Sequence, residues 1–290
     1  MIDEPQIRQE LPAQHRLGTW GQFAQSQWWK ALRDARASVL MLDYDGTLAA
    51  FTADRLRATA YAGVPERLIA LAGIRGVRLA ILSGRPAKEL LGLLPQELKL
   101  EIWGSHGRER LFPNGSYEAI PISPAQSRHL DEFEELAIGE GFAFVLERKL
   151  GSLALHTRSL DAGDAKRLFE LAQRKYRSMA LADTNAGFEW LPFDGGVEIR
   201  GTGRTKADAV ARILSEMPLD VPVAYLGDDH TDEDAFRVLQ DRENAASVLV
   251  RAQPRETAAK WWIVPPAELL AFLDRYLDTQ RERDHERAEP

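Results

Sequence analysis

Two carboxylates one residue apart are the most informative feature of the sequence. Asp43 and Asp45 follow directly after the apolar run 39–42 and stand before Gly46. An apolar run that ends in acids and a glycine predicts a buried strand, and the carboxyl end of such a strand is where open α/β sheets bind ligands. Two carboxylates this close repel each other unless a cation or a proton transfer uses them. The pair therefore indicates a site that binds a cation or transfers a proton.

Three further groups of polar residues follow or begin other predicted elements. Ser83 and Gly84 follow the apolar run 77–82, and Lys206 stands at the start of a predicted helix. The last group follows the run 221–226 and is acidic: Asp228, Asp229, Asp232, Glu233 and Asp234. Acids from distant strands, with one lysine and one serine, suit a phosphate group and a hard cation such as Mg²⁺. Because the chain has no cysteine and its histidines are scattered, a zinc site is poorly supported.

Composition narrows the classes of partner. The chain has 290 residues, of which 44% are hydrophobic and 28% charged, as in a globular protein of one large or two modest domains. Its formal net charge of -7 argues against nucleic acid, which needs a basic face. No run has membrane-span length and the N-terminus lacks a signal peptide's apolar core, so no membrane partner is expected. The lack of cysteine fits a cytoplasmic location.

Strands that alternate with helices predict a parallel sheet covered by helices. The runs 38–42, 77–82 and 221–226 are predicted strands that end in small or polar residues. Thr205 is expected to cap the helix that starts at Lys206. We therefore expect an α/β fold with a doubly wound, mostly parallel sheet.

The pattern changes in the middle of the chain. Helix–strand–strand, given twice, predicts a small α+β unit inserted into the larger sheet, which we name the cap. Aromatic residues at roughly helical spacing also predict one helix over 20–37. The expected division is an N-terminal helical extension at 1–37, a catalytic core at 38–115 and 200–276, the cap at 116–199, and a charged tail at 277–290.

Together, four motifs resemble those of the haloacid-dehalogenase-superfamily phosphatases. They are DYDGTL at 43–48, SGR at 83–85, Lys206, and GDDHTDEDAF at 227–236. Their order and spacing match that superfamily, and the resemblance covers the chain from about 38 to 273. The last motif resembles more specifically the family of trehalose-6-phosphate phosphatases.

The resemblance implies a role for each motif residue. Asp43 is implied as the nucleophile, and Asp45 as the acid for the leaving sugar oxygen and then the base for water. Asp43, the Asp45 carbonyl and Asp228 are implied as Mg²⁺ ligands, and Lys206 as a partner of both Asp43 and the phosphate. The other motif residues are implied in phosphate binding, for Ser83 and Gly84, or in support near the metal, for Asp229 and Asp232.

Alternation along two predicted strands assigns the faces of the cap. In a strand expected over 142–149, the face against the helices consists of Phe142, Phe144 and Leu146. The open face then presents Glu147 and Lys149, and a second strand over 197–200 adds Glu198. Carboxylates accept from sugar hydroxyls and an ammonium donates to them, so this open-face set suits a polyhydroxylated substrate.

Segments of the cap also resemble the trehalose-phosphatase family. The resemblance implies that the open-face set grips the glucose ring remote from the phosphate, with Arg85 and His106 near the same sugar. For His106 a structural turn histidine is the competing interpretation. For His156 and Arg158, structural hydrogen bonding in the cap is an equal alternative.

The expected function is Mg²⁺-dependent hydrolysis of trehalose 6-phosphate through an aspartyl-phosphate. The alternative in the same class is another glycosyl phosphate, of sucrose, mannosyl or glucosylglycerol type. A non-catalytic sugar-phosphate-binding regulator is the alternative in a different class, and the intact motif residues argue against it. No region of glycosyltransferase size is present, so we expect a functional link to a separate trehalose-6-phosphate synthase.

Overall fold

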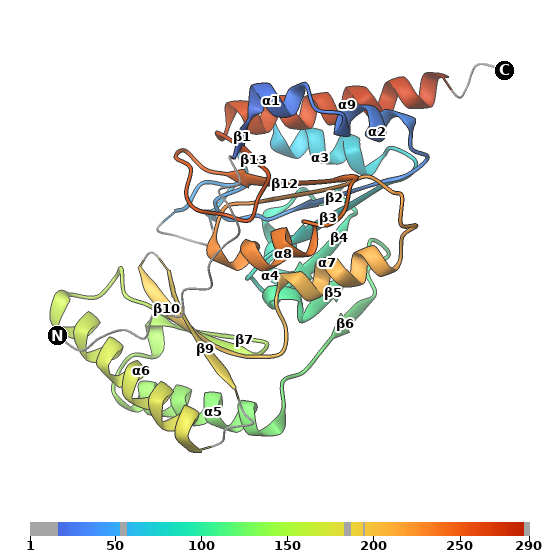
Figure 1. The fold of residues 1–290 in the computed structure, drawn as a ribbon. Coiled ribbons are helices and arrows are strands. Elements are labelled where there is room, and N and C mark those ends of the chain that lie inside the picture. The colour runs from blue at the N-terminus through green and yellow to red at the C-terminus, as the bar shows by residue number, and fades with distance from the viewer. Residues whose placement is uncertain (1–16, 53–56, 183–186, 194, 287–290) are drawn as a thin grey trace.

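The computed structural model describes residues 17–52, 57–182, 187–193 and 195–286. They form two sheets, each with its own helices (Figure 1). Residues 1–16 of the predicted extension and 287–290 of the predicted tail lie outside the described residues.

The larger sheet carries the predicted strands. Its members are β1 (Gly18–Thr19), β2 (Ser38–Leu42), β3 (Val77–Leu82), β4 (Glu101–Gly104), β5 (Glu109–Leu111), β6 (Tyr117–Ala119), β11 (Val223–Gly227), β12 (Ala245–Val250) and β13 (Trp261–Ile263). Within the described residues their order is β1-β13-β12-β11-β2-β3-β4-β5-β6. Neighbours from β1 to β4 are parallel, and β5 and β6 add antiparallel strands at one edge. The doubly wound, mostly parallel sheet is therefore confirmed, with β2 between β11 and β3.

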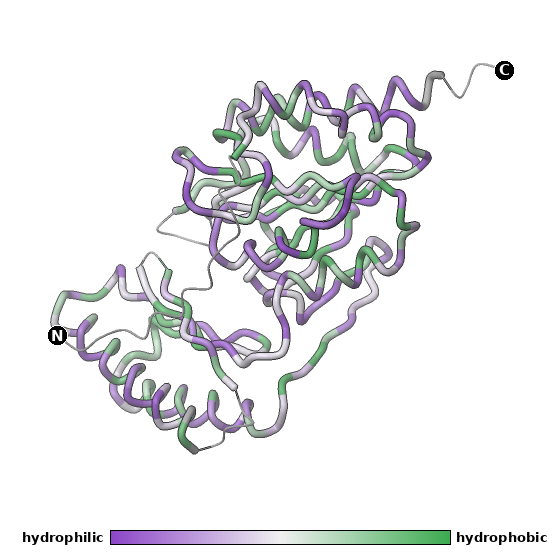
Figure 2. Tube along the Cα trace, viewed as in Figure 1, coloured by the Kyte–Doolittle hydropathy of each residue, from purple (hydrophilic) through white to green (hydrophobic). Residues whose placement is uncertain are grey.

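Helices cover both faces of this sheet. One face carries α1 (Trp20–Ala24), α2 (Trp28–Asp34), α3 (Val64–Ala72), α4 (Ala87–Leu93) and α9 (Ala267–Glu286), and the other carries α7 (Lys206–Ser215) and α8 (Glu233–Val238). Every residue of β2 and β11 is buried, and Figure 2 shows the central strands as largely hydrophobic. Each fully buried leucine, such as Leu40, contributes about 1.5–3 kcal/mol to stability. The buried central strands therefore hold the residues at their carboxyl ends in fixed positions.

The N-terminal aromatic segment forms two helices, so the prediction of one helix over 20–37 was wrong. A break at 25–27 separates α1 from α2. Phe23 and Trp29 both pack on Phe272 of α9, which side chains six residues apart cannot do on one straight helix. The Phe23 carbonyl also accepts from the Trp29 indole at 2.9 Å, which holds the break in place.

The smaller sheet is fully antiparallel and belongs to the cap. It contains β7 (Leu146–Lys149), β8 (Ser152–His156), β9 (Phe188–Phe193) and β10 (Gly196–Gly201), in the order β7-β8-β10-β9. Helices α5 (Pro124–Gly139) and α6 (Ala162–Ala182) pack on one face through a core that includes Leu130, Leu168, Leu153 and Ile199. In Figure 1 this sheet lies between those helices and the larger unit, so its other face is turned toward the larger sheet.

The first cap strand is shorter than predicted. β7 begins only at Leu146, because the three residues before it form a 3-10 turn, η3 (Ala143–Val145). Phe144 is 71% exposed instead of packed against the helices, whereas Val145, expected on the open face, is buried. The chain leaves α5 through Gly141 in a left-handed conformation (φ 89°), and β8 pairs no further back than Leu146. The assignment of faces therefore fails at Phe144 and Val145, although Phe142 packs in the cap core as expected, and it holds from Leu146 onward.

Helix α9 continues through most of the segment expected as a charged tail. It ends at Glu286, and Gln280 and Arg283 are buried. Gln280 accepts from Ser38 at 3.4 Å, and Arg283 donates to the Arg75 carbonyl at 2.6 Å. Among the described residues, no helix is both long enough and apolar enough to cross a membrane.

Candidate active site

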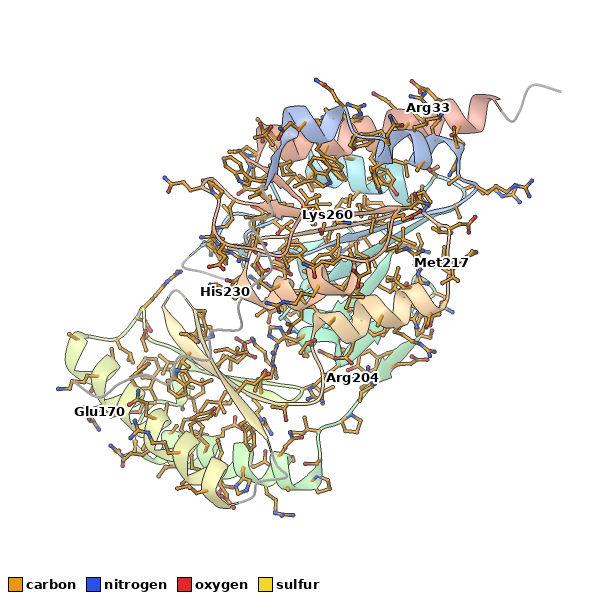
Figure 3. All side chains as sticks on the ribbon, in the orientation of Figure 1. Arg33, Glu170, Arg204, Met217, His230 and Lys260 are labelled. Carbon is orange, nitrogen blue, oxygen red and sulfur yellow. The ribbon has the colours of Figure 1, made fainter. Side chains whose placement is uncertain are left out.

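Three neighbouring strands bring their polar residues to one edge of the larger sheet. Asp43 follows β2, Ser83 follows β3, and Asp228 follows β11. Lys206, the first residue of α7, reaches the same edge. Figure 3 shows His230, in the turn after Asp228, on the side of the larger unit that faces the cap. The polar edge and the cap sheet therefore lie opposite each other.

Lys206 links two buried carboxylates. Its Nζ donates to Asp43 Oδ1 and to Asp232 Oδ1, both at 2.6 Å. Thr47 donates to the other oxygen of Asp43 at 3.4 Å. As predicted, Thr205 caps α7, because its hydroxyl accepts a backbone N–H of the first turn at 3.2 Å. This hydrogen bond of Thr205 fixes the start of α7 and so the position from which Lys206 reaches Asp43.

Asp232 has no acceptor capacity left. Its Oδ1 accepts from Lys206 and from the Tyr225 hydroxyl. Its Oδ2 accepts from the backbone N–H groups of Asp228 and Asp229, each at 3.0 Å. A carboxylate offers about four acceptor sites, and all are used here. Although this group lies within 4.8 Å of two other buried carboxylates, it braces the site and is unsuited to hold a cation.

Asp43 and Asp228 are the two carboxylates that fit a hard cation. In the described part of the chain, buried Asp228 Oδ1 has no hydrogen-bond partner. At Gly46 (φ 86°) a Cβ would lie 2.2 Å from Asp228 Oδ2, so only glycine lets this loop approach the carboxylate. Burial, and then the charge of Asp43, raise the pKa of Asp228 well above its usual range, and burial raises the pKa of Asp43 to about 7. A divalent cation between them would offset this repulsion.

Arg85 lies against Asp45. Its Nε and Nη2 donate to the two Asp45 oxygens, both at 2.6 Å, and its Nη1 donates to Glu89 at 2.6 Å. The Asp45 side chain is 27% exposed, so it can meet a substrate as well as this guanidinium. Arg85, which was expected at the sugar, lies on Asp45. Asp229 Oδ1 accepts from the His230 N–H at 2.7 Å, and the charge of Asp229 is among those that raise the pKa of Asp228.

The loop after β4 is strained beside Ser83 and Gly84. Ser105 and His106 both adopt left-handed backbone conformations (φ 48° and 55°), which cost energy in residues other than glycine and often occur at functional sites. Glu109 holds this loop by accepting from the Ser105 hydroxyl. A Cβ at Gly84 would lie 2.7 Å from the His106 ring, so glycine lets this ring pack on the Ser83–Gly84 turn.

His106 connects the polar edge to the cap. Its Nε2 lies 3.5 Å from Glu198 Oε2 of β10. Burial lowers the pKa of His106, so its ring is neutral near pH ~7 and has one donor and one acceptor nitrogen. With the carboxylate at Nε2, the acceptor is Nδ1, which is buried and has no partner among the described residues.

Three cap strands gather the open-face set. Glu147, Ala154 and Glu198 are direct neighbours across β7, β8 and β10. Lys149 Nζ lies 3.3 Å from Glu198 and 3.8 Å from Glu147, and His156 Nε2 lies 3.0 Å from Glu147. The cross-strand register thus brings together side chains that are about fifty residues apart in the sequence.

Glu198 is the centre of this cluster. Its Oε1 accepts from the Ser152 hydroxyl, and its Oε2 faces Lys149 and His106. Burial opposes its charge, but Lys149 and His106 outweigh burial and hold the pKa of Glu198 well below its usual range. Arg158, beyond β8, donates to the Thr52 carbonyl of the larger unit at 3.2 Å and so forms a second link between the units.

Two residues that sequence analysis missed also belong to the site. Tyr225 binds Asp232, and Arg251 donates to the Asp228 carbonyl at 3.2 Å. Tyr225 gave no signal, because β11 is buried on both faces and alternation shows no contrast there. Arg251 gave no signal, since it follows a strand at a position where a solvated arginine is ordinary.

The chain matches the family model described as Trehalose-phosphatase over residues 41–262. It is 28% identical over 255 residues to probable trehalose-phosphate phosphatase 4 of Oryza sativa subsp. japonica, covering 84% of this chain and 66% of that relative, or just under two thirds. It is 28% identical over 253 residues to trehalose-6-phosphate phosphatase of Escherichia coli (strain K12), covering 85% and 90%.

Solved structures agree on the fold. The C-terminal domain of Candida albicans trehalose-6-phosphate phosphatase superposes with a TM-score of 0.71 at 19% identity, covering 87% of this chain and 95% of that domain. A phosphatase of the haloalkanoate (HAD) superfamily from Bacteroides thetaiotaomicron superposes with a TM-score of 0.54. The chain belongs to the trehalose-phosphatase family, and the expected HAD fold is confirmed.

Proposed function

We propose that this member of the trehalose-phosphatase family hydrolyses trehalose 6-phosphate to trehalose and inorganic phosphate, with Asp43 as the nucleophile. The observation that carries the proposal is the buried Lys206–Asp43 hydrogen bond of 2.6 Å beside Asp228 Oδ1, which has no hydrogen-bond partner among the described residues. The rice and Escherichia coli relatives, both named as trehalose-phosphate phosphatases, support the substrate.

In the first step, an oxygen of Asp43 attacks the phosphorus and the bond to the sugar oxygen breaks. The proton for the leaving sugar oxygen comes from Asp45, which is partly exposed beside the nucleophile. Two of the three Lys206 N–H groups hold Asp43 and Asp232, and the third, with the Ser83 hydroxyl, donates to phosphoryl oxygens. The product of this step is an aspartyl-phosphate on Asp43.

In the second step, Asp45 takes a proton from water, and the water oxygen attacks the phosphorus. The bond between Asp43 and phosphorus breaks, so inorganic phosphate leaves and both carboxyl groups return to their starting states. Both Asp45 oxygens accept from Arg85 in the structure, so this guanidinium releases one of them when Asp45 carries the proton. The two aspartates thus divide covalent attack and proton transfer between them.

Mg²⁺, when bound, supplies positive charge that neutralises the phosphoryl oxygens as charge shifts in the transition state. Asp43, Asp228 and the Asp45 carbonyl would hold it. Two observations support this ligand set: the buried Asp228 oxygen without a partner, and the close approach of Gly46 to the same carboxylate. Asp232 is excluded from the set because its acceptor sites are filled.

The cap provides the sugar specificity in this proposal. Glu147 and Glu198 accept from hydroxyls of the glucose ring remote from the phosphate, and Lys149 donates to its oxygens. His106 Nδ1, which has no partner in the part of the chain that the structure describes, accepts a hydrogen bond from a sugar hydroxyl. Trehalose 6-phosphate must come from a sugar-transfer reaction, so the proposal includes a functional link to a separate synthase. It also includes a cytoplasmic location.

Phosphate release from a panel of sugar phosphates with Mg²⁺ tests the proposal. Trehalose 6-phosphate should be the best substrate, and Asp43→Asn should abolish turnover of every member. Preference for another glycosyl phosphate, such as sucrose 6-phosphate, would overturn only the substrate. Full turnover by Asp43→Asn would overturn the nucleophile, and no turnover of any phosphate by the wild type would overturn the enzyme.

A further inference from the structure

Tyr225 is a fully buried tyrosine whose hydroxyl reaches the network that holds the nucleophile. It lies on β11, three residues before Asp228. Its ring packs edge-on against Phe236 of α8, with ring centroids 5.6 Å apart. The hydroxyl donates to Asp232 Oδ1. Neither the motifs nor the mechanism above uses this side chain.

Tyr225 and Lys206 donate to the same oxygen. Lys206 Nζ lies 2.6 Å from Oδ1 of Asp232 and 2.6 Å from Oδ1 of Asp43, so it is shared equally by the two carboxylates. The Asp232 oxygen that Lys206 uses is also neutralised in part by the Tyr225 hydroxyl. Because two donors share it, this oxygen attracts Lys206 less strongly than it would without the Tyr225 hydroxyl.

We propose that Tyr225 is a positioning residue, whose hydroxyl keeps Lys206 from being drawn toward Asp232 and away from Asp43 and the phosphoryl oxygens. The proposal rests on the proposed function, because it assigns Lys206 to the phosphoryl group. The backbone N–H groups of Asp228 and Asp229 fix the other oxygen of Asp232, so this carboxylate cannot turn to compensate. The effect on Lys206 is therefore transmitted to Asp43.

The variant Tyr225→Phe removes the hydroxyl and keeps the ring that packs on Phe236. We expect kcat to fall roughly tenfold, since a hydrogen bond to a charged group is lost from a site that acts in the transition state. KM should stay within about twofold, because the cap contacts to the sugar are unchanged. Inhibition by orthovanadate, a phosphoryl mimic, should weaken about as much as kcat falls.

Tyr276→Phe is the matched control. Tyr276 is also a fully buried tyrosine of the larger unit, but it lies on α9, on the opposite face of the sheet. Its variant should keep the wild-type kcat and vanadate inhibition. The double variant Tyr225→Phe/Asp232→Asn adds a second readout: its kcat should match that of Asp232→Asn alone, since Tyr225 acts only through Asp232.

Three results would overturn the proposal. The first is a Tyr225→Phe variant with the kcat and vanadate inhibition of Tyr276→Phe. The second is a full additional loss in the double variant, and the third is a Tyr225→Phe variant that does not fold, which would make the hydroxyl structural. If Asp43→Asn retains turnover, the proposed function itself fails, so the two failures are distinguishable.

Discussion

Replacing Glu198 by glutamine tests the cap grip, because it keeps the shape of the side chain and removes its charge. Glu198 is 6% exposed, so water screens its partners little. Lys149 lies at 3.3 Å and His106 at 3.5 Å, both long contacts, so each belongs at the lower end of the about 1.5–3 kcal/mol given for hydrogen bonds to charged groups. These contacts hold Glu198 in place inside the protein. The bond that its charge makes to a sugar hydroxyl, about 1.5–3 kcal/mol, predicts a roughly 10- to 150-fold fall in kcat/KM for trehalose 6-phosphate.

The assay compares two substrates and one control variant. In Glu198→Gln the KM for trehalose 6-phosphate should rise, whereas kcat/KM for p-nitrophenyl phosphate, which has no sugar, should change little. Glu132→Gln is the control, because Glu132 pairs with Lys175 on the exposed helical side of the cap. Equal losses for both substrates, or a Glu198→Gln variant that behaves like Glu132→Gln, would refute the assignment of Glu198 to the sugar.

Two other changes have outcomes fixed by the structure. Hydrogen bonds from Arg110 and Arg78 lower the pKa of Glu216 to about 2. The stability that the Glu216 charge contributes is therefore full above about pH 4.5 and is lost as the pH falls toward 2. In urea unfolding at neutral pH, Glu216→Gln should be less stable than the wild type by about 1–2 kcal/mol, and this difference should disappear in acid. Gly46→Ala should weaken Mg²⁺ activation strongly, while Gly115→Ala, with the same backbone strain (φ 85°) but no nearby atom, should not.

The polar edge of the larger sheet was predictable from the sequence. Asp43, Ser83 and Gly227 each follow a largely apolar run, and parallel buried strands deliver such residues to a common edge of the sheet. Alternation also placed Glu147, Lys149 and Glu198 on one face of the cap sheet, because the register across β8 aligns them. These patterns depend on short-range geometry, which the sequence carries directly.

The rest depended on packing between distant segments. The 3-10 turn before Leu146 follows from how α5 ends, and the break at 25–27 follows from how two aromatic residues share Phe272. The pairing of Arg85 with Asp45 and the hydroxyl of Tyr225 on Asp232 join residues whose partners no local pattern indicates. In a strand buried on both faces, such as β11, a tyrosine shows no contrast with its neighbours.

The central claim is that Asp43 carries the phosphoryl group during turnover. The most direct measurement uses Asp45→Asn, which lacks the base for hydrolysis, mixed with Mg²⁺ and p-nitrophenyl phosphate, whose leaving group needs no acid, and quenched in acid. Peptide mass spectrometry should then find one phosphoryl group on Asp43, and none in Asp43→Asn treated in the same way. A wild-type enzyme that turns over while no adduct forms, or an adduct on another residue, would contradict the account.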